Sequence, residues 1–221
     1  RAMKMHGGGF ASGGGRRPTP EELETENVEA TRAGAASNLR RHVRNLAETS
    51  IPVIVSINRF EHDTEAEIEA IRDEAIKAGA KQVVLNEAFA RGGEGAAELA
   101  DAVVAACAAH DEAGRPYTSV VEHGMTIEET VLRVATNVYG AHTVDFSDKA
   151  QASLKTLEAW GMGSLPVCMA KTQYSFSHEP KVLGAPAGFT LPIREVRVNA
   201  GAGFVVAICG SMMTMPGLPT R

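Results

Sequence analysis

The sequence has no long hydrophobic run and no concentration of positive charge, and each absence excludes a class of protein. No apolar stretch approaches the roughly 20 residues that a membrane-spanning helix requires, and no signal-peptide pattern opens the chain. Lys and Arg are scattered among acidic residues, and the formal net charge is −5, so the basic surface typical of nucleic-acid-binding proteins is missing. We therefore expect a cytoplasmic protein that binds neither nucleic acid nor membranes.

Cysteine is also scarce, and the three thiols lie far apart at Cys107, Cys168 and Cys209. They form no Cys-x-x-Cys pair, and none has a histidine at metal-ligand spacing, so we expect no metal site. Each lies within an apolar segment. The pattern predicts buried thiols in a reducing compartment.

Two sequence patterns of common active sites are missing as well. The phosphate-binding pattern Gly-x-x-x-x-Gly-Lys-Ser/Thr does not occur, so no phosphate cradle is predicted. Neighbouring residues assemble no Ser/His/Asp or Cys/His group, and a general-base role for His6 has no support. We assign no catalytic residue.

What is present is typical of a folded chain of one large or two modest domains. Two glycine runs within residues 1–20 predict a loop there, because glycine maximises backbone freedom. The chain opens on Arg1 in place of Met, so we expect a fragment of a longer protein. We place an α/β domain at residues 21–115 and a smaller α+β lobe at residues 116–221.

The first domain shows alternating strand and helix patterns. A helix behind Asn38 as N-cap should run to about Thr49, and Asp63 or Thr64 should cap another helix that stops at Gly79. The run at residues 51–57 is apolar and β-branched, which predicts a central strand buried on both faces. A second strand at 82–85 and a helix through 99–107 complete a Rossmann-like parallel sheet with flanking helices.

The second half changes character, which is why we expect the smaller α+β lobe there. Helix patterns begin at Thr126 and cover residues 147–159. Strand patterns cover residues 165–169, 193–198 and 204–209.

Two aromatic residues follow the two predicted parallel strands. Carboxyl ends of parallel strands share one sheet edge, where ligands of open α/β sheets bind. Phe60 and Phe89 could therefore flank a planar ring such as a pterin or purine, with Asn58, Asn86 and Glu87 at its polar edge. The alternative is that both phenyl rings are core residues beneath the loops.

Two further segments could bind an anion, and each also has a purely structural explanation. The turn Gly92-Gly93-Glu94-Gly95 precedes a helix, so its N–H groups could bind an anion, or it could be turn structure alone. The segment from Lys171 to Ser175 groups a cation with hydroxyls, as a polyanion site does, but also fits a solvated loop.

Five blocks resemble the formate–tetrahydrofolate ligase family, in that family's order and across nearly the whole chain. The blocks are residues 1–8 (RAMKMHGG), 58–60 with 63–67 (NRF, DTEAE), 91–95 (RGGEG), 165–175 (LPVCMAKTQYS) and 213–219 (MTMPGLP). The resemblance implies an ATP-dependent enzyme that joins formate to N10 of tetrahydrofolate through formyl phosphate, usually as a homotetramer.

The resemblance also assigns roles to residues. It implies that Phe60 and Phe89 sandwich the pterin ring and that Leu85 lines the pocket. Phe89 stands where the family has Trp, and Glu61 where Pro is usual, which predicts weaker stacking and an altered rim. The family's P-loop and Mg–ATP contacts are absent here, so we expect the folate side of the site and no activity from the fragment alone.

The sequence is also compatible with two other classes of function. One is a non-catalytic folate- or nucleotide-binding module, and the other is a structural oligomerisation module. An upstream coding segment with a P-loop would favour the ligase, and protection by a folate analogue would exclude the purely structural module.

Overall fold

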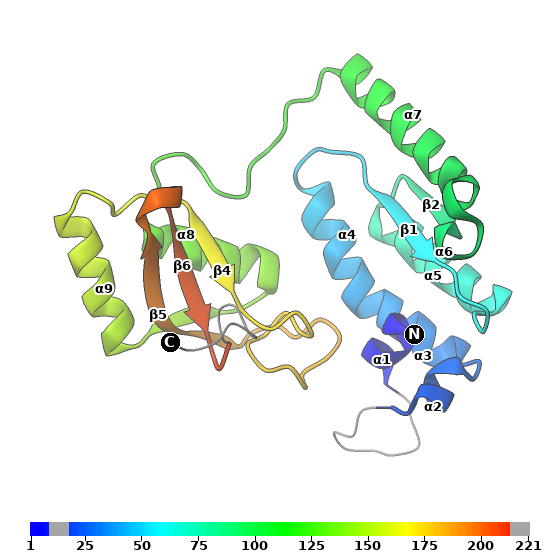
Figure 1. Cartoon of the computed structure of the whole chain (residues 1–221), viewed down its shortest axis with the longest axis horizontal. Helices are drawn as coiled ribbons and strands as arrows, with labels where there is room; N and C mark the ends of the chain where they lie inside the picture. Colours follow the sequence, from blue (N-terminus) through cyan, green and yellow to red (C-terminus); the bar gives the residue numbers. More distant parts are fainter. Residues whose placement is uncertain (9–17, 213–221) are drawn as a thin grey trace. The chain divides into compact units, whose positions relative to one another are not determined.

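The computed structural model describes residues 1–8 and 18–212, and the chain divides into two compact units (Figure 1). Unit 1 is Arg1–Thr118 and unit 2 is Ser119–Arg221. The second glycine run and the block at 213–219 lie outside the described residues. Both units combine helices with parallel strand pairs, which confirms the predicted α/β class.

The N-terminal helices of unit 1 differ from the prediction. The loop expected over residues 1–20 is wrong at its start, because α1 covers Ala2–Gly7, and α2 covers Pro20–Glu24. The helix expected behind Asn38 begins earlier: Asn27 caps it, and Asn38 lies buried within it. The continuous helix consists of α3 (Val28–Gly34), the π-helical turn η1 (Ala35–Leu39) and α4 (Arg40–Ala47).

Helices α1 and α3 pack so closely that only glycine fits at their contact. A Cβ atom on Gly7 would lie 1.8 Å from the carbonyl oxygen of Ala30, and one on Gly34 would lie 1.9 Å from that of Met3. Such backbone-to-backbone packing depends on residues distant in sequence. Helix α1 therefore could not be predicted from the helix propensity of its own residues.

The strand–helix alternation that follows is confirmed. Its elements are β1 (Ile54–Asn58), α5 (Glu65–Ala78), β2 (Gln82–Asn86), α6 (Ala88–Arg91), the 3₁₀ turn η2 (Gly92–Ala96) and α7 (Ala97–Ala113). The hydroxyl of Thr64 accepts from the Glu67 amide and starts α5. Gly79, with φ of 109°, ends it in the left-handed conformation.

The sheet of unit 1 is smaller than predicted, because a central strand needs a neighbour on each side. Among the described residues β1 pairs only with β2, in parallel, and Ser56 in the middle of β1 is exposed. Helix α7 packs along β2, while α4 packs against α5 (Figure 1). The buried core consists of Val43, Val53, Ile57, Ile68, Ala75, Ala78, Ala80 and Val83.

A buried ion pair joins three segments of unit 1. The ammonium group of Lys4 donates to the carbonyls of Leu23 (2.9 Å) and Thr25 (2.8 Å) and pairs with the Glu67 carboxylate (2.8 Å). The same carboxylate oxygen accepts from the Asn27 amide at 2.6 Å. Both charged side chains are almost fully buried. The pair thus connects α1, the α2–α3 connection and α5.

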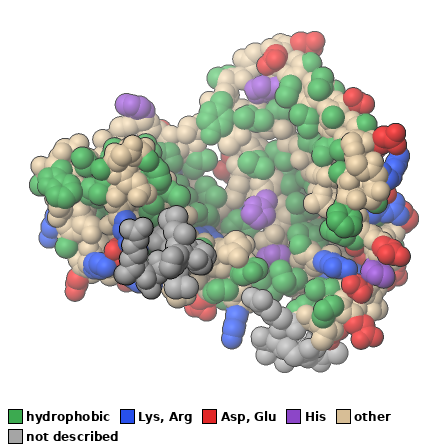
Figure 2. All heavy atoms as spheres, in the orientation of Figure 1, with side chains coloured by type: hydrophobic (Ala, Val, Ile, Leu, Met, Phe, Trp, Pro, Cys, Tyr) green, Lys and Arg blue, Asp and Glu red, His purple; other side chains and the backbone are tan. Residues whose placement is uncertain are grey.

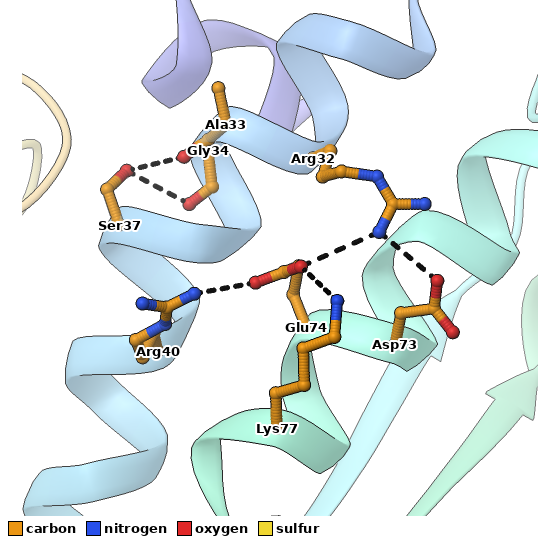
Figure 3. A network of polar contacts seen from close by, with 8 residues as sticks. All are labelled: Arg32, Ala33, Gly34, Ser37, Arg40, Asp73, Glu74 and Lys77. Atoms are coloured by element: carbon orange, nitrogen blue, oxygen red, sulfur yellow. Dashed lines mark hydrogen bonds and ion pairs between the residues drawn. The ribbon is translucent and has the colours of Figure 1, made fainter.

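A second carboxylate holds α5 against the long helix. Figure 3 shows Glu74 between Arg40, at 2.7 Å, and Lys77, at 2.9 Å, with Arg32 at 3.5 Å. Arg32 also pairs with Asp73 at 3.1 Å. Hydrogen bonds from Lys77 and then Arg40 lower the pKa of Glu74, although burial acts in the opposite direction.

Unit 2 is a mixed sheet with helices. Its elements are α8 (Ile127–Arg133), the π-helical turn η3 (Val134–Tyr139), β3 (Thr143–Phe146), α9 (Asp148–Ala159), β4 (Val167–Ala170), β5 (Thr190–Asn199), the 3₁₀ turn η4 (Ala200–Ala202) and β6 (Phe204–Cys209). The strand order is β3-β5-β6-β4, antiparallel only between β5 and β6. Thr126 and Ser147 cap the two predicted helices. Strand β3 was not predicted.

Three sequence predictions concern charge, thiol burial and membrane-spanning helices. On the face that Figure 2 shows, acidic and basic groups are interspersed rather than gathered by sign. Of the three cysteines only Cys209 is buried, so the prediction of buried thiols is wrong for Cys107 and Cys168. No described helix is long and apolar enough to cross a membrane.

We predict that Lys4→Met lowers the free energy of unfolding of unit 1 by about 3–5 kcal/mol, because Glu67 would remain buried without its counter-charge. The control is Arg1→Met, which removes the exposed pair with Glu24 and the guanidinium contact with the Phe60 ring and should cost less than about 2 kcal/mol. Amide hydrogen exchange of β1 and α5 measures the change. Equal effects of the two substitutions would contradict the prediction.

We predict that Glu74→Gln destabilises unit 1 at neutral pH and progressively less in acid. The folded-state pKa of Glu74 is lowered, so its contribution is complete above the ordinary carboxyl pKa of 4.5 and is lost as the pH falls from there through the lowered pKa. Urea denaturation of both proteins from pH 7 to pH 3 measures the difference. A difference that does not change with pH would exclude this role.

Candidate functional site

The carboxyl ends of β1 and β2 lie side by side, as the predicted site requires. Asn58 and Asn86, the last residues of the two strands, are partners in the parallel register. The side-chain amide of Asn86 donates to the Asn58 side-chain oxygen at 3.0 Å. The Arg59 amide donates to the Asn86 carbonyl at 3.1 Å, which continues the strand pairing by one step.

Phe60 and Phe89 meet just beyond these strand ends. Their ring centroids are 6.3 Å apart, and the ring planes are inclined by 46°. Phe60 is 45% exposed and Phe89 is 92% exposed, which excludes the alternative that both are core residues. The two rings therefore form an exposed aromatic pair at the sheet edge where ligands of α/β folds bind.

A tight turn holds Phe60. Its amide donates to the Asp63 carboxylate at 2.9 Å, and the Asp63 amide donates back to the Phe60 carbonyl at 3.1 Å. The Arg1 guanidinium lies 5.7 Å from the centre of the Phe60 ring, within cation–π range. The turn thus fixes the main chain of Phe60, and the Arg1 guanidinium contacts its ring.

Phe89 has far fewer constraints. It lies on the four-residue helix α6, whose first amide, at Ala88, donates to the Asn86 side-chain oxygen at 3.1 Å. Glu87, expected at the polar edge of a bound ring, pairs with Arg91 at 3.1 Å and lies 3.9 Å from Arg59. Leu85 is half buried opposite Ile57 and packs against the core of unit 1.

The glycine turn folds back on the start of α6. Gly92, Gly93, Glu94 and Gly95 all lie in η2, and the Gly95 carbonyl accepts from the Glu87 amide at 3.0 Å. Because a Cβ on Gly95 would lie 2.5 Å from the Glu87 carbonyl, only glycine fits. This contact supports a structural role for Gly95. Anion binding by the turn stays a prediction.

A cavity of about 370 Å³ lies beside Phe60 and was not predicted from the sequence. Its walls include Asn58, Phe60 and the buried pair Lys4–Glu67. The Thr31 hydroxyl, also on the wall, is buried and has no hydrogen-bond partner among residues 1–8 and 18–212. These side chains come from four separate segments, so no local pattern could have signalled the cavity.

The segment Lys171 to Ser175 in unit 2 folds around the Lys171 ammonium, and its binding of a polyanion stays a prediction. The Lys171 ammonium donates to the carbonyls of Thr172 (2.9 Å) and Ser175 and lies 4.9 Å from the centre of the Tyr139 ring. Burial lowers the pKa of Lys171 and raises that of Tyr139 to about 12. Thr172 and Ser175 are buried, which contradicts a solvated loop, and the cation is used within the loop.

Comparison with known proteins identifies one family. The formate–tetrahydrofolate ligase family model matches residues 1–221. A formate–tetrahydrofolate ligase of Paracoccus denitrificans is 49% identical over 219 residues, which are 99% of this chain and 37% of that protein. The C-1-tetrahydrofolate synthases of Schizosaccharomyces pombe, cytoplasmic and mitochondrial, are 42% and 41% identical over 100% of this chain and 23% and 22% of theirs. The chain thus spans 22–37% of the length of these relatives.

We predict that Gly95→Ala displaces α6 and destabilises unit 1 by about 1–3 kcal/mol, since the new methyl group meets main-chain atoms that cannot move aside. Gly93→Ala is the matched control, because a Cβ there meets nothing within 4 Å. Thermal unfolding by circular dichroism measures stability, and the chemical shifts of the Phe89 ring report displacement. Indistinguishable variants would contradict the close packing.

Proposed function

This chain belongs to the formate–tetrahydrofolate ligase family, and from that membership we propose that it supplies the pterin-binding side of an ATP-dependent ligase. The reaction joins formate to N10 of tetrahydrofolate and converts ATP to ADP and phosphate. The observation that carries the proposal is the exposed pair Phe60 and Phe89 at adjacent ends of two parallel strands. The match to the family over the whole chain supports it.

Pterin binding requires the two phenyl rings to separate. Each stacked face needs a carbon–carbon distance of about 3.5–4.0 Å, so a ring between two phenyl groups needs roughly 7–8 Å between their planes. The rings are closer than this and inclined. Phe89, which is almost fully exposed, can rotate away while the turn at Asp63 holds Phe60 in place. Leu85 forms part of the pocket wall in this proposal.

ATP, Mg²⁺ and formyl phosphate are bound elsewhere in this proposal. The sequence contains no P-loop, and residues 1–8 and 18–212 hold no cluster of three or more His, Cys, Asp or Glu that could bind a metal ion. Phosphoryl transfer needs a lysine, backbone donors and a metal around the phosphates. The residues of this chain would hold and orient the pterin, so the isolated chain should be inactive as a ligase.

We further propose that the complete enzyme is a cytoplasmic homotetramer, as the resemblance implies. The exposed apolar side chains Val103 and Val104 on α7 are available for contacts with other parts of the complete enzyme.

We predict that tetrahydrofolate binds the purified chain and that Phe60→Ala and Phe89→Ala each weaken binding by about 1–3 kcal/mol, the usual contribution of one aromatic stack. Phe89→Trp should strengthen binding, because indole offers a larger stacking face. Isothermal titration calorimetry measures the affinities.

The control is Tyr117→Ala, which removes an exposed aromatic ring elsewhere in unit 1 and should leave the affinity unchanged. If Phe60→Ala and Tyr117→Ala bind equally well, the aromatic pair is not the pterin site. If the folded wild-type chain shows no saturable binding, these residues do not form a half-site by themselves.

A further inference from the structure

We propose that the side chains of Asn58 and Asn86 form an amide clasp that positions Phe60 and Phe89, rather than binding the edge of the ligand themselves. The inference deepens the proposed function and rests on it for the identity of the ligand. It rests independently on the hydrogen bond between the last residues of the two strands. The sequence suggested both asparagines as ligand-binding groups, whereas the structure shows their side chains bound to each other.

The orientation of the clasp follows from the main chain. The amide of Ala88 can only donate, so the Asn86 side chain must turn its oxygen toward it. The Asn86 nitrogen then faces Asn58, which must present its own oxygen. One main-chain N–H thus fixes the orientation of Asn86 and of the Asn58 oxygen that it meets.

The clasp connects the supports of the two rings. Asn86 contacts Ala88, which directly precedes Phe89 on α6, while Asn58 lies two residues before Phe60. On the main chain, the Arg59 amide donates to the Asn86 carbonyl. This last hydrogen bond between the two strands lies one residue before Phe60. Phe89 has no core contact to fix its position, since it is 92% exposed. The clasp therefore connects the start of α6 directly to the strand end before Phe60, beside the contact of Gly95 with Glu87 that packs α6 from its other end.

The test uses single and double substitutions that keep side-chain volume. In Asn58→Asp a carboxylate still accepts from Asn86, and in Asn86→Asp the Asn58 amide can flip and donate. The double variant Asn58→Asp with Asn86→Asp places two carboxylates against each other, with no donor between them. The matched control, Asn58→Asp with Gln82→Glu, adds the same charge with the second group at the exposed far end of β2.

The first readout needs no ligand. Nuclear Overhauser contacts between the Phe60 and Phe89 rings, in chains labelled at phenylalanine, should persist in wild type, both single variants and the matched control, and disappear in the double aspartate variant. A double variant that keeps the ring contact would overturn the proposal, and so would a single variant that loses it. If the double variant does not fold, Asn86→Ala removes the clasp without adding charge and takes its place.

The second readout is tetrahydrofolate affinity by calorimetry. The double aspartate variant should bind about fivefold more weakly, which is the size expected for one lost hydrogen bond. The single variants and the matched control should bind within about twofold of wild type. Equal affinity of the double variant and the matched control would overturn the role in binding. Failure of the wild-type chain to bind would count against the proposed function, while the ring contacts would still decide whether the clasp exists.

Discussion

The buried pair Lys4–Glu67 is the interaction on which the arrangement of unit 1 depends. Removing two charges from water is costly, and it is tolerated only where every donor and acceptor has a partner. Lys4 meets this condition with two carbonyls and a carboxylate, and Glu67 also accepts from the amide of Asn27. The pair fixes α1 and the start of the long helix against the first turn of α5.

That first turn is also the support of the aromatic site. Thr64 caps α5, and Asp63 just before it closes the turn that holds Phe60. The second ring comes from a different segment, and it reaches the first only because β1 and β2 are parallel and in register at Asn58 and Asn86. The site therefore combines a rigid half, fixed by buried charges and a helix cap, with a half on a short helix at the surface.

Sequence patterns predicted what local chemistry decides. A cap at Asp63 or Thr64, helix starts at Thr126 and Ser147 and a helix stop at Gly79 depend on neighbouring residues, and the structure confirms them, with Thr64 as the cap. Helix α1 could not be predicted, because its contact with α3 depends on the absence of side chains at Gly7 and Gly34. The aromatic pair followed from strand-end spacing. The asparagine contact and the cavity near Thr31 involve long-range neighbours that no local pattern reveals.

The exposure of Phe89 has a consequence for how such a site changes over evolutionary time. A ring that is 92% exposed and lies on a four-residue helix contributes little to the folded state, so replacing it leaves the core intact. Replacing Phe89 by another aromatic residue therefore changes the exposed stacking face without a cost to the folded state. The proposed binding face can therefore change by substitution without passing through unstable intermediates.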